Sequence, residues 1–147
     1  MIRALFVCSH NSARSQMAEG LLRHFSAGRI EALSAGTEPG RLHPLAVVAM
    51  AELGVDISGQ AAKNVDAFAG QTFEYVVTVC DQAKESCPVF PGARSQLHWS
   101  LPDPSAATGS EQERLDAFRH VRDLLRPLVH EFMTGAENDA SHIRTPA

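Results

Sequence analysis

The sequence predicts a three-layer α/β fold (αβα) built on a four-stranded, parallel sheet. Three observations support this prediction. Short apolar or β-branched runs alternate along the chain with segments whose apolar residues recur at helical spacing. The chain has 147 residues, of which 44% are hydrophobic, and this is enough for one core in a single domain. No internal repeat or linker divides the sequence.

Four segments have the character of strands. Residues 2–7 form a short apolar run, which is typical of a strand buried on both faces of a parallel sheet. Residues 73–79 are the most strand-like in the chain, because β-branched and aromatic residues dominate them. We expect the two remaining strands over residues 30–35 and 94–99.

Helices are expected between these strands. From Arg14 onward apolar residues recur at helical spacing, and Gly28 is expected to end that helix. Pro44 suits the first turn of a second helix, which Gly54 would cap at its C-terminal end. Residues 64–69 are expected to form a short helical turn.

The last helix begins at a capping box and runs toward Gly135. Ser110 and Glu113 have the spacing of that box. The residues beyond Gly135 have little apolar content, so we expect them to fray. The sequence therefore predicts one domain over residues 1–134 and a flexible tail over residues 135–147.

Charge and hydropathy limit the partners of this chain. Thirteen Lys and Arg stand against 17 Asp and Glu, so no broad basic field is available for a nucleic acid or an anionic membrane. No apolar run approaches the roughly 20 residues of a membrane span, and the N-terminus lacks the layout of a secretory signal. We expect a cytoplasmic monomer that captures any anion locally.

The three cysteines are Cys8, Cys80 and Cys87. An odd number in a reducing compartment argues against a framework of structural disulfides. Cysteine and histidine spacings typical of zinc sites are absent, so we expect no metal. The cysteines are then either inert core residues or chemically used.

The segment from Cys8 to Ser15 lies between the first strand and the first helix. Such a loop directs backbone N–H groups and the positive end of the helix dipole at one spot, which makes an oxyanion site. Cys8 at its rim would be stabilised as a thiolate, to which Ser15 could donate. Arg14 can hold two oxygens of a tetrahedral anion. The predicted oxyanion-binding loop comprises Ser9, His10, Asn11, Ser12, Ala13 and Arg14.

These residues, continued as Ser15-Gln16-Met17-Ala18-Glu19-Gly20, resemble the active-site loop and first helix of the arsenate reductases built on the low-molecular-weight tyrosine phosphatase fold. The resemblance covers about residues 2–133 and implies that fold. Further motifs follow in the same order: Val76-Val77-Thr78-Val79-Cys80, Cys87-Pro88, His98-Trp99 and Asp103-Pro104.

The resemblance implies a thiol-dependent reduction of arsenate without a cofactor. The counterpart of Cys8 attacks arsenate, that of Arg14 holds the oxyanion with the loop amides, and that of Asp103 protonates the departing hydroxide. Phosphate or sulfate would compete for the loop. Asp103 lies in a proline-bracketed loop after a strand, which suits a general acid. The alternative is a turn aspartate that makes only a local bond.

A reductase also needs a second thiol, and Cys80 is placed to supply it. Cys8 and Cys80 both end strands, and if those strands are neighbours, about 4.8 Å apart, the two cysteines fall within disulfide reach. Cys87 would then attack Cys80 and pass the oxidation to thioredoxin, with glutaredoxin or a small thiol as alternative reductants. A helix between Cys80 and Cys87 would hold them about 10.5 Å apart. We therefore expect residues 80–90 to lose helix on oxidation.

Some relatives bind potassium beside the loop through side chains matching Asn11, Glu19 and Ser34. Where the family has a further carboxylate this chain has Lys63, which would oppose a cation. Asn11 has a simpler role in the loop, because asparagine tolerates the left-handed backbone of a tight anion nest.

Two other functions stay open at this point. A low-molecular-weight protein-tyrosine phosphatase would use only Cys8, Arg14 and Asp103. Such phosphatases carry aromatic residues after the Asp-Pro pair, whereas this chain has Ser105-Ala106-Ala107. A non-catalytic oxyanion sensor would have a Cys8 no more reactive than a free thiol.

Overall fold

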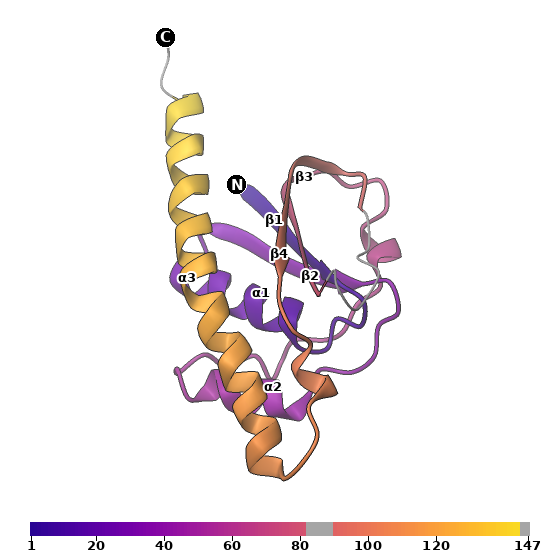
Figure 1. Ribbon diagram of the computed structural model, residues 1–147. Helices are drawn as coiled ribbons and strands as arrows, with labels where there is room; N and C mark the ends of the chain where they lie inside the picture. The colour runs from indigo at the N-terminus through magenta and orange to yellow at the C-terminus, as the bar shows by residue number, and fades with distance from the viewer. Residues whose placement is uncertain (82–89, 145–147) are drawn as a thin grey trace.

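The computed structural model describes residues 1–81 and 90–144. Its centre is a four-stranded parallel sheet with the strand order β2-β1-β3-β4, which confirms the predicted sheet (Figure 1). Each strand extends at most one residue beyond its predicted ends. The strands are β1 (Ile2–Cys8), β2 (Ile30–Gly36), β3 (Phe73–Cys80) and β4 (Ala93–Ser100).

Three α-helices and two 3-10 turns complete the described fold: α1 (Arg14–Phe25), α2 (Pro44–Ala51), α3 (Glu111–Arg144), η1 (Val65–Phe68) and η2 (Pro104–Ala106). Gly28 and Gly54 follow the first two helices with φ of 79° and 74°, a conformation that favours glycine and ends a helix. Although α3 has 34 residues, none of the described helices is apolar enough over a sufficient length to cross a membrane.

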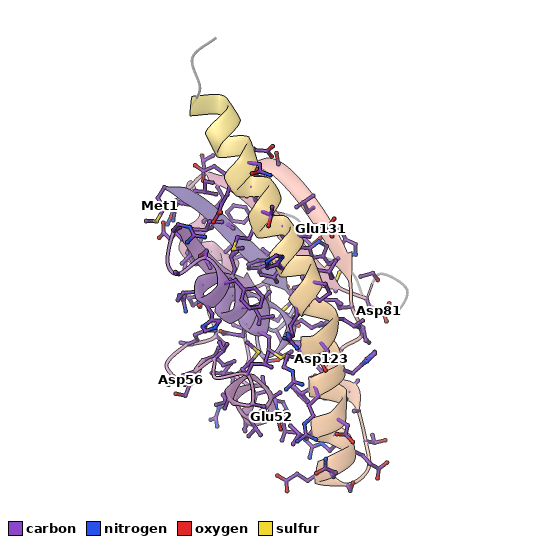
Figure 2. The ribbon with its side chains drawn as sticks, turned by 90° about the vertical axis from the view of Figure 1, so that its left-hand side faces the viewer. Met1, Glu52, Asp56, Asp81, Asp123 and Glu131 are labelled. Carbon is purple, nitrogen blue, oxygen red and sulfur yellow. The ribbon has the colours of Figure 1, made fainter. Side chains whose placement is uncertain are left out.

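Two cores hold the layers together. The larger core lies between one face of the sheet and the three α-helices, with α3 crossing in front of α1 in Figure 2. The smaller core lies on the opposite face, where Phe68 of η1 and Phe90 pack on Phe73. This arrangement exposes the carboxyl ends of the strands, and ligands of parallel sheets bind beyond that edge.

The start of α3 agrees with the prediction, whereas its C-terminal end does not. The capping box is confirmed, because the Glu113 amide donates to Ser110 Oγ at 3.1 Å and the Ser110 amide to Glu113 Oε1 at 3.2 Å. The predicted helix end near Gly135 is wrong, since the helix continues to Arg144. Three features tie the extension to the body: buried Ala136, the Arg29–Glu137 ion pair at 2.9 Å and the Tyr75–Asp139 hydrogen bond at 3.1 Å.

The extension also shows why the sequence misplaced the helix end. Glycine inside a helix costs roughly 1 kcal/mol relative to alanine, and the contacts of the extension with Arg29 and Tyr75 offset that cost. Such contacts cannot be read from the local pattern. The domain boundary at residue 134 and the flexible tail stay predictions.

Candidate active site

The loop between β1 and α1 is wound around the sulfur of Cys8. The Asn11 amide donates to Cys8 Sγ at 3.2 Å, and Ser15 Oγ lies 2.9 Å from the same sulfur. Cys8 is a free thiol with 2% of its surface exposed. The structure therefore brings the predicted Cys8 and Ser15 into direct contact and fixes the sulfur at the start of the helix.

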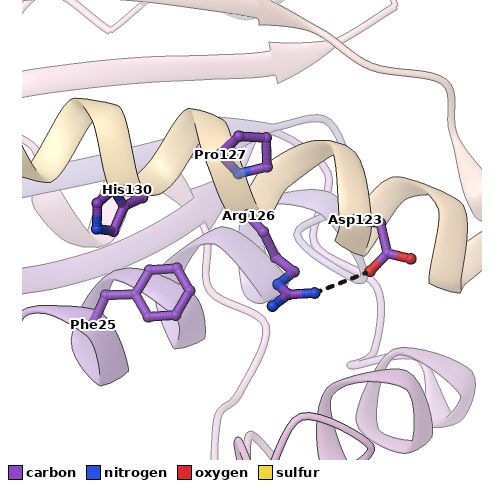
Figure 3. A pocket seen from close by; sticks show the side chains of 5 residues that line it. All are labelled: Phe25, Asp123, Arg126, Pro127 and His130. Atoms are coloured by element: carbon purple, nitrogen blue, oxygen red, sulfur yellow. Dashed lines mark ion pairs between the residues drawn. The ribbon is translucent and has the colours of Figure 1, made fainter.

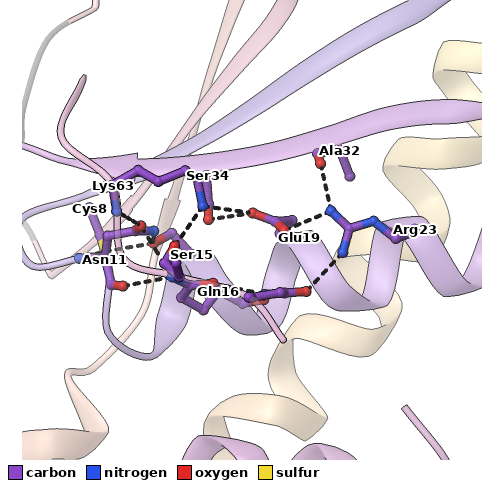
Figure 4. Close-up of polar contacts among 11 residues, drawn as sticks. Cys8, Asn11, Ser15, Gln16, Glu19, Arg23, Ala32, Ser34 and Lys63 are labelled. Atoms are coloured by element: carbon purple, nitrogen blue, oxygen red, sulfur yellow. Dashed lines mark hydrogen bonds and ion pairs between the residues drawn. The ribbon is translucent and has the colours of Figure 1, made fainter. Parts of the chain in front are cut away.

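Asn11 holds the loop in shape from inside. Its φ is 50°, in the left-handed region that asparagine tolerates, which confirms the backbone role predicted for it. It is fully buried, and its Nδ2 donates to Ser15 Oγ at 2.8 Å. Its Oδ1 accepts from the Lys63 amide at 2.8 Å and from Gln16 Nε2 at 3.2 Å (Figure 4). The Asn11 side chain thus ties the loop to α1 on one side and to the Lys63 backbone on the other.

Gly36, at the end of β2, is a site residue that the sequence reasoning missed. A Cβ at this position would stand 2.6 Å from the Ser9 carbonyl oxygen and 2.9 Å from the Asn11 amide nitrogen, both backbone atoms. Only glycine lets the loop pass so close to the strand. The sequence offers one sign of this role, a glycine directly after a predicted strand. In the sheet, Gly36 pairs with Cys8.

The N-terminus of α1 is left open to a ligand. Its N-cap residue is Ala13, no described side chain caps it, and the first turn holds no acidic residue. The first amides of a helix have no intrahelical partner and carry the positive end of the helix dipole. Together with the loop around Cys8, these amides have the geometry that the predicted anion-binding site requires.

Arg14 and Asp103 face each other beside this loop. Arg14 is 3% exposed, its Nη1 donates to the Leu101 carbonyl at 3.1 Å, and its Nη2 lies 3.9 Å from Asp103 Oδ2. The other carboxylate oxygen of Asp103 accepts from the Ser105 amide at 3.0 Å and from its hydroxyl at 2.6 Å. Asp103 thus makes the local turn bond of the alternative interpretation with one oxygen and directs the other toward Arg14.

The strands that carry Cys8 and Cys80 are neighbours, as the disulfide prediction requires. Cys8 belongs to the core on the helix side, whereas alternation along β3 assigns Cys80 to the opposite face, that of Val76. Cys80 is fully buried and disulfide-bonded. Cys87 and most of the segment expected to lose helix lie outside the described residues.

Glu19 occupies the place where the resemblance suggested potassium. It is 3% exposed, and Ser34 Oγ donates to its Oε1 at 2.6 Å. Arg23 Nη2 lies 2.7 Å from Oε2, and Lys63 Nζ lies 3.7 Å from Oε1 (Figure 4). Two cationic side chains therefore balance this buried carboxylate from within the chain. Sequence reasoning identified Lys63 but not Arg23.

Two histidines lie at the edge of the loop. His10 Nδ1 lies 3.1 Å from the Glu38 carbonyl. His43 Nδ1 accepts from the Leu45 amide at 3.1 Å and so caps α2, while the His43 amide donates to the Ser12 carbonyl at 2.9 Å. Burial and then the charge of Arg114 lower the pKa of His43, and Asp103 opposes them. His43 thus supports the loop.

A separate pocket of about 380 Å³ lies at the other end of α1, against α3 (Figure 3). Its lining residues are Phe25, Asp123, Arg126, Pro127 and His130. Arg126 Nη1 lies 4.0 Å from Asp123 Oδ1, so its charge is partly balanced. The pocket contains no cysteine, and α1 separates it from Cys8 by about 16 Å at 1.5 Å per residue.

Comparison with known proteins is consistent with this geometry. Residues 3–142 match the family of low molecular weight phosphotyrosine protein phosphatases. An arsenate reductase of Shouchella clausii is 39% identical over 132 residues, which cover 90% of this chain and 95% of that protein.

Two solved structures extend the likeness to three dimensions. An arsenate reductase in its phosphate-binding state has a TM-score of 0.79 and 33% identity, covering 92% of this chain and 98% of the other. A thioredoxin-dependent arsenate reductase of Corynebacterium glutamicum has a TM-score of 0.62 and 29% identity, covering 92% of this chain and 63% of the other. The chain therefore belongs to the low molecular weight phosphotyrosine protein phosphatase family, and its relatives there include arsenate reductases.

Proposed function

We propose that the protein is an arsenate reductase that thioredoxin regenerates. One observation carries the proposal: the chain combines a free thiol inside an oxyanion loop with a second, disulfide-bonded cysteine at the end of the adjacent strand. A phosphatase needs only the first of these features. A reductase needs both, because the electrons that reduce arsenic come from a pair of thiols.

The first step uses the loop. The loop amides and the Arg14 guanidinium hold the arsenate oxygens, and the Cys8 thiolate attacks arsenic. A sulfur–arsenic bond forms and an arsenic–oxygen bond breaks. Asp103, in its protonated form, gives its proton to the departing hydroxide, which leaves as water. Arsenic is still pentavalent at this stage. The opposed positions of Arg14 and Asp103 support these two roles.

The second step moves the electrons. The Cys80 thiolate attacks Cys8 Sγ, so that a disulfide forms and the sulfur–arsenic bond breaks. The electron pair of that bond stays on arsenic, which becomes trivalent and leaves as arsenite. Cys87 then attacks Cys80 and releases Cys8 as a thiolate. The dithiol of thioredoxin reduces the resulting disulfide and is itself oxidised.

Strand geometry adds one requirement to this sequence. Because Cys8 and Cys80 belong to opposite faces of the sheet, the end of β3 has to turn before their sulfurs can meet. Among the described residues, one backbone link at this end is a 3.3 Å bond from the Leu101 amide to the Cys80 carbonyl. A single bond of this kind contributes about 0.5–1.5 kcal/mol net.

The test is arsenate-dependent oxidation of NADPH in the presence of thioredoxin and thioredoxin reductase. Wild type is compared with Cys8→Ser, Cys80→Ser and Cys87→Ser, and we expect each substitution to abolish turnover. A wild type that does not reduce arsenate but hydrolyses an aryl phosphate through Cys8 would instead be a phosphatase. Absence of both activities, with Cys8 alkylated no faster than a free thiol, would leave the oxyanion sensor.

A further inference from the structure

His98, on β4, has a buried ring nitrogen that the mechanism above does not use. Its Nδ1 lies 2.7 Å from Thr78 Oγ1 on β3. Its Nε2 is buried and has no hydrogen-bond partner among the described residues. Buried polar atoms are nearly always paired, because an unpaired one costs roughly 1–3 kcal/mol. An atom kept unpaired at such a cost calls for a functional explanation.

The neighbouring bonds allow a tautomer in which Nδ1 carries the proton. Thr78 Oγ1 has one proton, which it can donate to the Leu97 carbonyl at 3.4 Å or to His98 Nδ1 at 2.7 Å. When the Leu97 carbonyl takes it, Thr78 Oγ1 accepts from Nδ1–H, and a neutral ring then has its lone pair on Nε2. In this tautomer, on which the inference below rests, His98 is a base whose accepting atom is buried.

This base lies on the face of the sheet to which Cys80 belongs. In the register of β3 and β4, Thr78 pairs with His98 and Cys80 with Ser100. Positions two residues apart on a strand share a face, so His98 and Cys80 are diagonal neighbours, a spacing that aromatic side chains can span. The other titratable side chains that alternation assigns to this face of the two strands are Glu74 and Arg94, at the opposite end.

We infer that His98 accepts the thiol proton of Cys80 when Cys80 attacks Cys8, an inference that rests on the proposed function. The proton moves from Cys80 Sγ to His98 Nε2, and the sulfur electron pair forms the bond to Cys8 Sγ. Arsenic takes the electron pair of the broken sulfur–arsenic bond, as described above. When thioredoxin later reduces the disulfide and Cys80 leaves as a thiolate, His98 returns the proton. No further oxidant or reductant is required.

Burial explains why Cys80 needs such a partner. Its surface is 0% exposed in this disulfide-bonded state. Only the thiolate is a nucleophile, and burial in apolar surroundings disfavours that charged form. A base positioned within the protein removes this barrier. General base catalysis of this kind typically contributes about 10²–10⁴ in rate.

The experiment compares His98→Gln with wild type and with His120→Gln, a matched substitution at an exposed histidine of α3. Arsenate-dependent turnover with thioredoxin should fall by about 10² or more in His98→Gln and stay unchanged in His120→Gln. Thr78→Val, which removes the partner of Nδ1, should lower turnover by a smaller factor.

Alkylation of the reduced protein by iodoacetamide, resolved by peptide mass spectrometry, separates a proton-transfer role from a structural one. In His98→Gln, alkylation of Cys80 should slow at neutral pH and recover as the pH is raised, since hydroxide then replaces the base. Alkylation of Cys8 should match wild type at every pH. Equal slowing at both cysteines, or wild-type rates at both, would overturn the inference.

The alkylation arm does not require arsenate. If wild type fails to reduce arsenate, the proposed function fails, and Cys80 alkylation still reports whether His98 acts on that thiol. If wild type reduces arsenate and His98→Gln does so equally fast, the role of His98 is wrong and the proposed function stands.

Discussion

The Cys8 loop and the β3–β4 face that carries Cys80 place their polar groups in contrasting ways. In the loop, the sulfur, Asn11 and Ser15 satisfy one another within eight residues of chain. On the β3–β4 face, Cys80 and His98 come from strands joined by a long connection, and one ring nitrogen has no described partner. On our proposals, the first region holds a charge, and in the second a proton and a sulfur move.

This difference determines which features of the two regions could be predicted from the sequence. The loop is one continuous segment of chain. Its oxyanion-binding role could therefore be predicted from the eight residues Cys8 to Ser15, which lie where a predicted strand gives way to a helix. The strands, the Ser110 capping box and the positive φ of Asn11 were likewise encoded locally and are confirmed.

What the sequence could not reveal depends on pairing between distant residues. Gly36 is needed only because the loop crosses the end of β2, and His98 gains its orientation from Thr78 on another strand. The balance of Glu19 by Arg23 and the extension of α3 past Gly135 likewise arise from tertiary contacts. Each is a consequence of register or packing, for which hydrophobic periodicity contains no signal.

Within the loop, the largest effect is expected when a lysine ammonium replaces the planar guanidinium of Arg14. In Arg14→Lys the positive charge stays but the planar fork is lost, so two oxyanion contacts reduce to one. Arsenate-dependent turnover should fall by about 10²–10³, the typical cost of one oxyanion donor. Steady-state kinetics measure this. Arg126→Lys, at the pocket of Figure 3, is the matched control and should leave turnover unchanged.

A medium effect is expected where the loop meets β2. In Gly36→Ala the new Cβ meets two backbone atoms that cannot rotate away, so the loop shifts and the protein loses about 1–3 kcal/mol of stability. Denaturant unfolding measures the loss, and turnover should fall with it. Gly135→Ala is the control, since open space surrounds this helical glycine and alanine there should stabilise by about 0.5–1 kcal/mol. A neutral Gly36→Ala would mean that the loop tolerates displacement.

The smallest effect concerns pH at the edge of the loop. The lowered pKa of His43 in the folded state means that the unfolded chain binds its proton more readily below pH 6.5. His43 therefore contributes stability that is present above pH 6.5 and lost as the pH falls through that value. His43→Asn keeps an N-cap acceptor for α2 without titrating. The difference in unfolding free energy between the two proteins should change between pH 7 and pH 5, and a constant difference would contradict this.

In the proposed relay Cys8 and Cys80 join during turnover, although they belong to opposite faces of the sheet. The direct measurement uses Cys87→Ser, in which the relay stops after the second step, treated with arsenate without thioredoxin and then acid-quenched. Peptide mass spectrometry should find a Cys8–Cys80 disulfide and one arsenite released per protein chain. Arsenite release with both thiols free, or no disulfide after prolonged exposure to arsenate, would contradict the account.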